Sequence, residues 1–360
     1  MSEIINQIIN GGIVAVKTED DFLNEVKEVE FNTSYIPVEI ASLNFVGGGD
    51  TNVLNLEENE KSGFFVNCNS GNKLSLACRP YSVKTFCDRL GISGPLLSKI
   101  SNEKLAELLN FCKQEYPVNE SIQIVKLGED CCLAALSDGY KVLAADEVFT
   151  KAFVEIKKLG GEFSSGYIDA DIFHASFILK NEQLKEIYAE KFEEFSNGMP
   201  MLDIETSNTG LSSVSIIPKF KFKDFELIVG KPLKVLHKGN SDMTAVDEAI
   251  GQIFPIFKSS IDGLARLKKV RIENPLFCFK NIAKRVLLPK KYSMLAAENF
   301  ENFLGNEVNA FDVYWGLTEV LFYAKNDERP QVFLNMLEEQ IARALYLDYS
   351  KYDVPYSEWK

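Results

Sequence analysis

The chain has 360 residues, of which 46% are hydrophobic and 25% are charged, a composition typical of a globular protein rather than a disordered one. Its 39 Lys and Arg residues against 52 Asp and Glu residues give a net charge of −13 at neutral pH. No stretch approaches the roughly 18 uncharged apolar residues of a membrane-spanning helix, so we expect no membrane partner. The first ten residues carry an acid and no base, unlike the basic start of a secretory signal.

Cysteine and histidine usage limits the chemistry that the chain can carry. The number of cysteines, seven, is odd, and we find no secretory signal in the sequence. Both observations favour free thiols in a reducing cytoplasm. There is no Cys-x-x-Cys pair, and His174 and His237 are the only histidines. We also find no Gly-rich phosphate loop and no dinucleotide fingerprint. The sequence therefore favours a protein without catalytic residues, cofactor or metal.

The first part of the chain, residues 1–75, is expected to be an irregular, β-rich segment. Short apolar runs broken by Gly and Asn predict its strands. These runs are Ile36–Ile40, Val53–Leu56 and Phe64–Asn67. A further strand over Lys73–Arg79 leads into the next part of the chain.

Residues 76–240 are expected to form an α+β core. Apolar residues at helical spacing predict helices over Ser82–Leu90, Ser101–Tyr116, Asp146–Leu159 and Asn181–Glu194. Strand-like runs lie at Ser121–Leu127, Cys131–Leu136, Ser165–Leu179, Leu202–Asn208, Ser212–Phe222 and Phe225–Leu236. Because helices and strands do not alternate regularly, the pattern favours a mixed, mostly antiparallel sheet with flanking helices over a doubly wound sheet.

Residues 241–360 are expected to form a helical C-terminal subdomain. One long helix is predicted over Thr244–Val270, kinked or split near its middle by Pro255. Further helices are predicted at Ser293–Leu304, Val308–Lys325 and Pro330–Leu347. The whole chain is thus predicted to have an α+β fold.

Charge is distributed unevenly along the chain. The window 211–291 holds 16 basic residues and seven acidic ones, a net charge of +9, which leaves −22 for the remainder. A basic window in an acidic protein indicates an anionic partner, with nucleic acid the first candidate. The alternative is that this window faces the acidic remainder of a neighbouring subunit, which would build a homo-oligomer.

Within the window, Lys219, Lys221 and Lys223 alternate with Phe220 and Phe222. On a strand, the three ammonium groups would lie on one side, about 6.6 Å apart, and could follow a phosphate backbone. The phenylalanines would lie on the other side, where they could stack on bases if that face were open. The alternative is a half-buried strand with Phe in the core and Lys in water.

Other cations in the window extend the predicted nucleic-acid-binding set. Arg266 to Arg271 form the C-terminal tail of the predicted helix, where they could also complement its dipole. The predicted nucleic-acid-binding set has nine residues. They are the three strand lysines together with Lys234, Lys238, Arg266, Lys268, Lys269 and Arg271.

Two carboxylates offer a weaker alternative. Asp169 and Asp171 would share one face of a strand and could hold magnesium, which would make the chain a metal-dependent enzyme. No third ligand can be assigned from the sequence, so a solvated strand face is the simpler interpretation.

Several segments, in order, resemble the phage- and plasmid-borne family known as domain of unknown function 932. The resemblance covers roughly residues 75–350, and the ordered set of segments carries it. They are Arg79-Pro80-Tyr81-Ser82, Leu90-Gly91-Ile92, Leu136-Ser137-Asp138-Gly139-Tyr140, Ser207-Asn208-Thr209-Gly210, His237 in Leu-His-Lys-Gly, and Trp315-Gly316-Leu317-Thr318-Glu319.

The chain departs from the pattern of this family at two places. Gly139 replaces the usual Arg, and Glu226–Gly230 stands where the family tends to have Cys-Asn-Gly. The resemblance implies a mobile-element context, in which DNA recombination, replication and counter-defence are common tasks. Independently of the family, Arg79 is expected to anchor a carboxylate such as Asp138.

The sequence leaves three functions open. The first is a non-enzymatic, oligomeric nucleic-acid-binding protein that handles single-stranded DNA in recombination. The second is a counter-defence or self-assembling factor whose acidic surface engages a host protein. The third is the metal-dependent enzyme built on Asp169 and Asp171.

Overall fold

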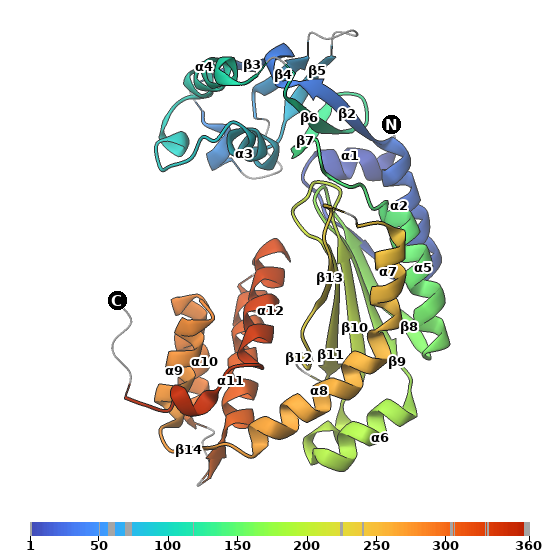
Figure 1. The fold of residues 1–360 in the computed structure, drawn as a ribbon, viewed down its shortest axis with the longest axis vertical. Helices are drawn as coiled ribbons and strands as arrows, with labels where there is room; N and C mark the ends of the chain where they lie inside the picture. Colours follow the sequence, from blue (N-terminus) through green and yellow to red (C-terminus); the bar gives the residue numbers. More distant parts are fainter. Residues whose placement is uncertain are drawn as a thin grey trace.

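The computed structural model describes residues 2–49, 51–56, 62–68, 74–117, 119–223, 226–239, 241–302, 305, 307–327, 329 and 331–355. Four ends of predicted elements, at Lys73, Phe225, Leu304 and Pro330, lie outside these residues. Helices and mostly antiparallel sheets confirm the predicted α+β fold. Two sheets organise the molecule, one at the top of Figure 1 and one in its middle.

The upper sheet has six strands and is antiparallel except where β5 pairs with β7. In sheet order the strands are β2 (Thr33–Glu39), β6 (Ser121–Leu127), β7 (Cys131–Ser137), β5 (Leu74–Cys78), β4 (Phe64–Cys68) and β3 (Leu43–Gly47). Helices α3 (Pro80–Arg89) and α4 (Asn102–Cys112) cover one face, and Phe64, Phe86 and Leu105 lie in a core of their own. The proline at the start of α3 suits the first helical turn, where no backbone donor is needed.

The outer edge of β3 is capped by side chains rather than left open. Asn110 on α4 accepts a hydrogen bond of 3.0 Å from the backbone N–H of Phe45 and donates one of 2.7 Å to the carbonyl of the same residue. Lys113 donates to the carbonyl of Leu43. These bonds occupy groups with which another strand would pair, so this edge is protected from association.

The middle sheet has seven strands, and two short strands share the outer side of β11. The path runs β1 (Val14–Val16), β8 (Gly161–Ile168), β9 (Phe173–Leu179), β10 (Met199–Thr206), β11 (Val214–Lys221) and β12 (Glu226–Ile228), with β13 (Leu233–Val235) also beside β11. Along β11, Val214–Ile216 pair with β13 and Lys219–Lys221 pair with β12.

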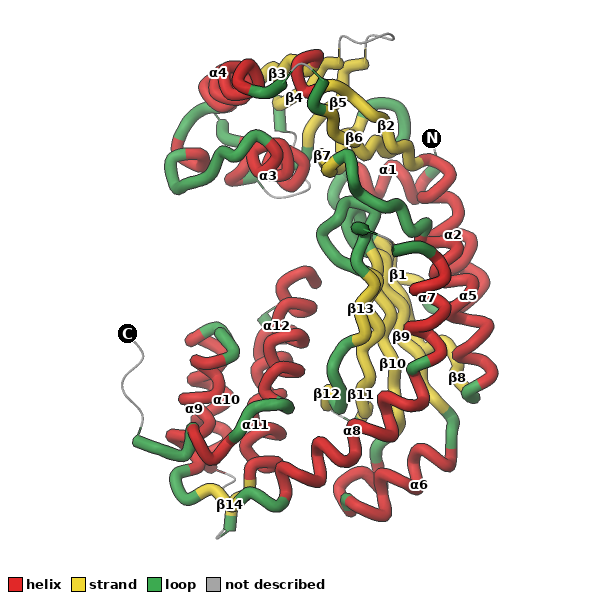
Figure 2. The backbone as a smooth tube through the Cα atoms, in the orientation of Figure 1, coloured by secondary structure: helices red, strands yellow, loops and turns green. Residues whose placement is uncertain are grey.

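One face of this sheet is apolar. Helices of the N-terminal and central parts of the chain cover it and lie beside the strands in Figure 2. Phe177 on β9, for example, meets Phe153 edge to face at 4.7 Å between ring centroids. The helices of the N-terminal and central parts of the chain are α1 (Glu3–Ile9), α2 (Glu19–Asn32), α5 (Ala145–Lys158), α6 (Glu182–Lys191), α7 (Met243–Gly251) and α8 (Ile253–Lys268).

The opposite face of the middle sheet is polar and is covered by the C-terminal helices (Figure 1). Asn309 begins helix α11 (Ala310–Asn326) with a capping box. The side chain of Asn309 accepts from the backbone N–H of Asp312, and the side chain of Asp312 accepts from that of Asn309. The remaining elements are α9 (Pro275–Arg285), α10 (Lys290–Asn302), α12 (Gln331–Ala344) and the small sheet of β14 (Arg271–Ile272) and β15 (Val308–Asn309). Short 3-10 turns lie at Ile40–Ser42, Val53–Asn55, Leu97–Lys99, Lys113–Glu115, Glu193–Asn197 and Tyr349–Lys351.

The N-terminal segment differs from the prediction. Residues 1–75 were expected to be irregular and β-rich, but they contain α1 and α2. Thr18 caps α2 and accepts from the backbone N–H of Asp21, and Phe22, Val26 and Val29 form a narrow buried stripe between acidic residues. The predicted boundary at residue 75 falls within β5.

Other predicted elements are divided or replaced. The strand predicted over Ser165–Leu179 is the hairpin of β8 and β9, and Val53–Leu56 is a 3-10 turn rather than a strand. The helix predicted over Thr244–Val270 is split into two helices, one of the two outcomes expected at Pro255, which lies in the first turn of α8, where its missing donor is tolerated. Helix α9 was not predicted. In the part of the chain that the structure describes, no helix is long and apolar enough to cross a lipid bilayer.

Candidate functional site

Of the strand lysines of the predicted nucleic-acid surface, Lys219 and Lys221 lie on β11 and Lys223 follows the end of that strand. The predicted alternation holds only in part. Phe220 is buried against the aromatic ring of Tyr188, on the apolar side of the sheet. Lys219 lies on the opposite side, but it is only 1% exposed because α12 covers it. The expectation that the ammonium group of Lys219 faces solvent is therefore wrong.

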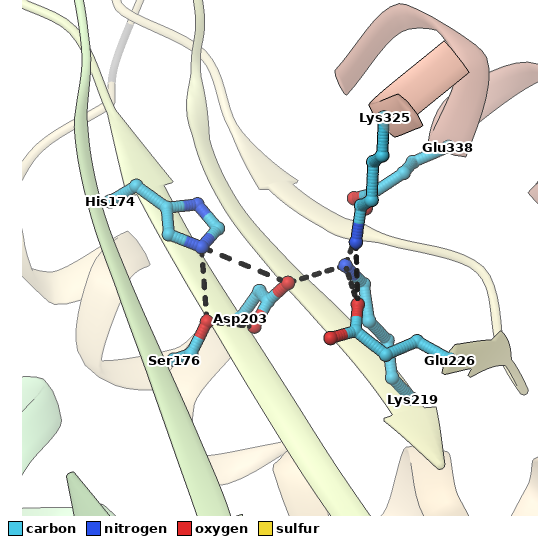
Figure 3. A network of polar contacts seen from close by, with 7 residues as sticks. All are labelled: His174, Ser176, Asp203, Lys219, Glu226, Lys325 and Glu338. Carbon is cyan, nitrogen blue, oxygen red and sulfur yellow. Dashed lines mark hydrogen bonds and ion pairs between the residues drawn. The ribbon is translucent and has the colours of Figure 1, made fainter. Parts of the chain in front are cut away.

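Lys219 is instead the centre of a buried ion cluster, drawn in Figure 3. Its ammonium group pairs with the carboxylate of Asp203 on β10, with Glu338 on α12 at 2.5 Å, and with Glu226 on β12 at 3.6 Å. Lys325 on α11 reaches Glu226 at 3.2 Å. Burial lowers the pKa of Lys219, but the facing carboxylates outweigh it and hold that pKa well above its usual value.

A polar chain continues from this cluster across the sheet. The hydroxyl of Ser176 donates to Asp203 at 2.6 Å, and the Nε2 atom of His174 lies 3.1 Å from the same hydroxyl. Because the single proton of Ser176 points at Asp203, Nε2 of His174 must be the donor to Ser176. Burial lowers the pKa of His174, so the ring is neutral. Burial raises the pKa of Asp203, but Lys219 overrides this and brings it to about 2.

This arrangement does not activate a nucleophile. Ser176 is buried, and the histidine donates to its hydroxyl instead of accepting a proton from it. Asp203, Glu226 and Glu338 place carboxylate oxygens within 4.8 Å of one another, as a cation site would. The Lys219 ammonium contacts all three carboxylates and supplies the positive charge there. We therefore interpret the cluster as the ionic contact that holds the C-terminal helices on the sheet.

The other two strand lysines line a small cavity beyond the buried cluster. The cavity has a volume of about 190 Å³ and lies between the end of β11, β12 and α11. Among the described residues, neither Lys221 nor Lys223 forms an ion pair with an acid. The lining residues are Lys221, Phe222, Lys223, Glu226, Thr318, Leu321, Phe322 and Lys325.

The aromatic residues of this cavity differ in exposure. Phe222 is half-buried and packs against Trp315 at 5.3 Å and Phe195 at 5.6 Å. Phe322, which lies on the same helix as Trp315, is 46% exposed. The cavity therefore combines three lysines and an exposed ring, with one glutamate that is already paired to Lys325.

One cation at the end of α8, Lys268, lies beside aromatic rings that lead to Trp315. The ammonium group of Lys268 sits 4.8 Å from the ring centroid of Phe192 and 5.5 Å from that of Phe311. Phe311 in turn packs against Trp315 at 5.7 Å. Lys269 and Arg271 are exposed, whereas Arg266 donates to the carbonyl of Leu345 at 3.2 Å.

Lys234 and Lys238 are placed apart from this cavity. Lys234 pairs with Glu339 and lies opposite Ser215 in the sheet, six residues along β11 from Lys221. At the rise of a β-strand, this separation is about 20 Å. Lys238 is exposed after β13 and lines a different cavity. The nine predicted residues therefore do not form one continuous surface.

The alternative pair of carboxylates lies in the turn between β8 and β9, not on a strand face. Asp171 forms a buried ion pair of 3.1 Å with Arg79, so Arg79 anchors a carboxylate as expected, and that carboxylate is Asp171 rather than the example Asp138. Asp169 accepts hydrogen bonds from the backbone of Asp171 and Ile172, and burial raises its pKa to about 6. Asp171 thus joins the turn of the middle sheet to Arg79 of the upper part, whereas Asp169 stabilises the turn itself.

Several of the segments behind the family resemblance meet at this junction. The hydroxyl of Tyr140 donates to the carbonyl of Ser207 at 3.1 Å, and its ring stacks on His237 at 5.0 Å. Gly210 has a positive φ of 75° and lies against Leu136 and Tyr140, so a larger residue would not fit.

Comparisons with known proteins do not identify the chain. No family model matches it, and searches of curated proteins and of solved structures found no similar one. The resemblance stated from the motifs stays a prediction.

Sequence reasoning missed the contributions of the C-terminal helices. Glu338, Lys325 and Phe322 come more than 90 residues after β12, and each lies on an ordinary helix. Only the folded arrangement brings them to the end of β11.

Proposed function

We propose that the chain is a non-enzymatic nucleic-acid-binding protein and that it contacts phosphates at the basic cavity beside the end of β11. The observation that carries the proposal is the lining of this cavity by Lys221, Lys223 and Lys325, with Glu226 already engaged by lysines. Lys325 is paired with Glu226, so the ammonium groups of Lys221 and Lys223 are the ones left to attract a phosphate backbone and release its counterions.

The surface proposed here is smaller than the one predicted from sequence. Lys219 and Lys234 are left out because carboxylates of the same chain neutralise them. Lys268 lies over the ring of Phe311, which packs against Trp315 beside the cavity, and Lys269 and Arg271 follow it in the chain as exposed cations. They would extend the path of a bound strand beyond the cavity.

The test is a fluorescence anisotropy titration of a labelled oligothymidine with the variant Lys221→Glu/Lys223→Glu. We expect binding at least about tenfold weaker than that of the unmodified protein, because two phosphate contacts become repulsive. The control is Lys17→Glu/Lys27→Glu, an equal change of charge at exposed residues near β1 and on α2. Equal weakening by both variants, or no binding by the unmodified protein, would contradict the proposal.

The proposal includes the homo-oligomer predicted from the charge asymmetry. The basic window of one subunit would face the acidic remainder of the next, and α2 begins with three consecutive acids, Glu19, Asp20 and Asp21. Mass photometry with and without a short oligonucleotide measures assembly and binding together. A monomer under both conditions would remove the oligomer from the proposal but not the binding surface.

A phage or plasmid origin and a task in recombination rest on the resemblance of the ordered motifs. They are kept as the setting in which such a binding protein would act. The protein-binding alternative predicts a stoichiometric host protein in place of nucleic acid, and the same titration separates the two.

A further inference from the structure

The cavity at the end of β11 has an exposed aromatic ring at a position where a base could reach it. Phe322 lies on α11, a helix whose other apolar residues, such as Val320 and Ala324, are buried. Phe322 itself is 46% exposed and lines the cavity together with three lysines. The ring of Phe322 meets that of Tyr323 edge to face, with 5.6 Å between the ring centroids and 77° between the ring planes.

The other aromatic residue that lines the cavity, Phe222, is fixed in place. Phe222 contacts Phe195, Phe220 and Trp315 in one aromatic cluster, at centroid distances between 5.3 and 6.4 Å. A ring held by three neighbours provides a rigid wall, whereas Phe322 offers its surface to solvent. The cavity therefore pairs one rigid aromatic wall with one accessible ring.

Size decides which form of nucleic acid fits. The volume of about 190 Å³ is below the roughly 300 Å³ at which pockets for whole drug-sized molecules begin. A space of this size admits one planar ring system while the rest of the strand stays outside. The bases of a duplex are paired and stacked, so only an unpaired base can turn into it.

We infer that the cavity takes a single unpaired base, stacked on Phe322, while Lys221 and Lys223 contact the phosphates on either side. The ligand is thus single-stranded nucleic acid. This inference rests on the proposed function. The pattern combines a basic rim with an aromatic platform, as sequence-tolerant single-strand binding requires, because every base has a π-face.

The experiment compares three labelled ligands of about 20 nucleotides or base pairs in anisotropy titrations: oligothymidine, an abasic strand with the same number of phosphates, and a duplex. We expect oligothymidine to bind about 5- to 100-fold more tightly than the abasic strand, as one stacked base allows. The duplex should bind no better than the abasic strand.

Variants of the ring assign the preference. Phe322→Leu should remove the preference for oligothymidine and leave the salt dependence unchanged, while Phe322→Tyr should keep it. Phe277→Leu, at a ring on α9 that is 41% exposed, is the matched control and should keep the preference. Circular dichroism melting confirms that each variant folds.

The outcomes separate this inference from the proposed function. Equal binding of the abasic strand and oligothymidine by the unmodified protein would overturn base stacking and leave phosphate binding intact. A preference that survives Phe322→Leu would also overturn it, because another ring would then be the platform. No binding of any ligand would overturn the proposed function together with the inference.

Discussion

Lys219 on β11 and Glu338 on α12 form a buried ion pair of 2.5 Å across 119 positions of the sequence. This pair joins the polar face of the middle sheet to the C-terminal helices. Because Lys219 also faces Asp203 and Glu226, a single ammonium group supports three carboxylates in a site that water barely reaches. The stability of the covered face should therefore depend on this one lysine.

Replacing Lys219 with Met is expected to lower the free energy of unfolding by about 3–5 kcal/mol, because carboxylates are left buried without their cation. The matched control is Lys234→Met, which breaks a partly exposed pair with Glu339 and should cost about 0–1 kcal/mol. Urea unfolding measures both variants. Similar small losses for the two would show that the cluster does not hold the helices.

Glu205 gives the protein a pH dependence. Burial raises the pKa of this carboxyl to about 7, with Glu338 and Glu339 adding to the effect and Ser212 and Lys219 opposing it. The folded protein keeps a proton that the unfolded chain releases near the usual value of 4.5. The free energy of unfolding should therefore fall as the pH rises from the unfolded value to about 7.

The variant Glu205→Gln is expected to lose this part of the slope and to be more stable than the unmodified protein at pH 8, by up to about 3 kcal/mol. The measurement is a series of urea unfolding curves between about pH 5 and pH 8. Asp169, whose pKa is raised to about 6, contributes in the same direction in both proteins and so does not confound the comparison. Parallel pH profiles would refute the assignment.

Arg79 and Asp171 join the upper sheet to the turn of the middle sheet. Their ion pair is 3.1 Å long, and Arg79 is only 7% exposed. In a double-mutant cycle with Arg79→Met and Asp171→Asn, we expect a coupling energy of at least about 1 kcal/mol, because the two groups share a buried contact. If the stability losses of the two single variants sum to that of the double variant within about 0.3 kcal/mol, the pair contributes nothing to the junction.

Elements with strong local signals could be predicted from the sequence. The strand Ser121–Leu127 was predicted with its observed bounds, because apolar residues and the turn at Gly128 mark it clearly. The helices α3 to α6 were also predicted, with small shifts at their ends. Helix α2 was missed because its buried residues are separated by acids and form a narrow stripe.

The candidate site was less predictable, for a physical reason. Alternation of Lys and Phe gives the side of the strand on which each residue lies, and this held for Lys219 and Phe220. It cannot show that a distant helix covers that side with Glu338. Exposure of a polar sheet face depends on tertiary packing, and no local pattern around Lys219 encodes it.

The central claim is that Lys221 and Lys223 contact phosphates. The most direct measurement is the slope of log Kd against log salt concentration for a labelled oligothymidine, with the unmodified protein and with Lys221→Gln/Lys223→Gln. The account predicts that the slope decreases in magnitude by about 1.4, since each contact with a single strand contributes about 0.7. An unchanged slope would contradict it.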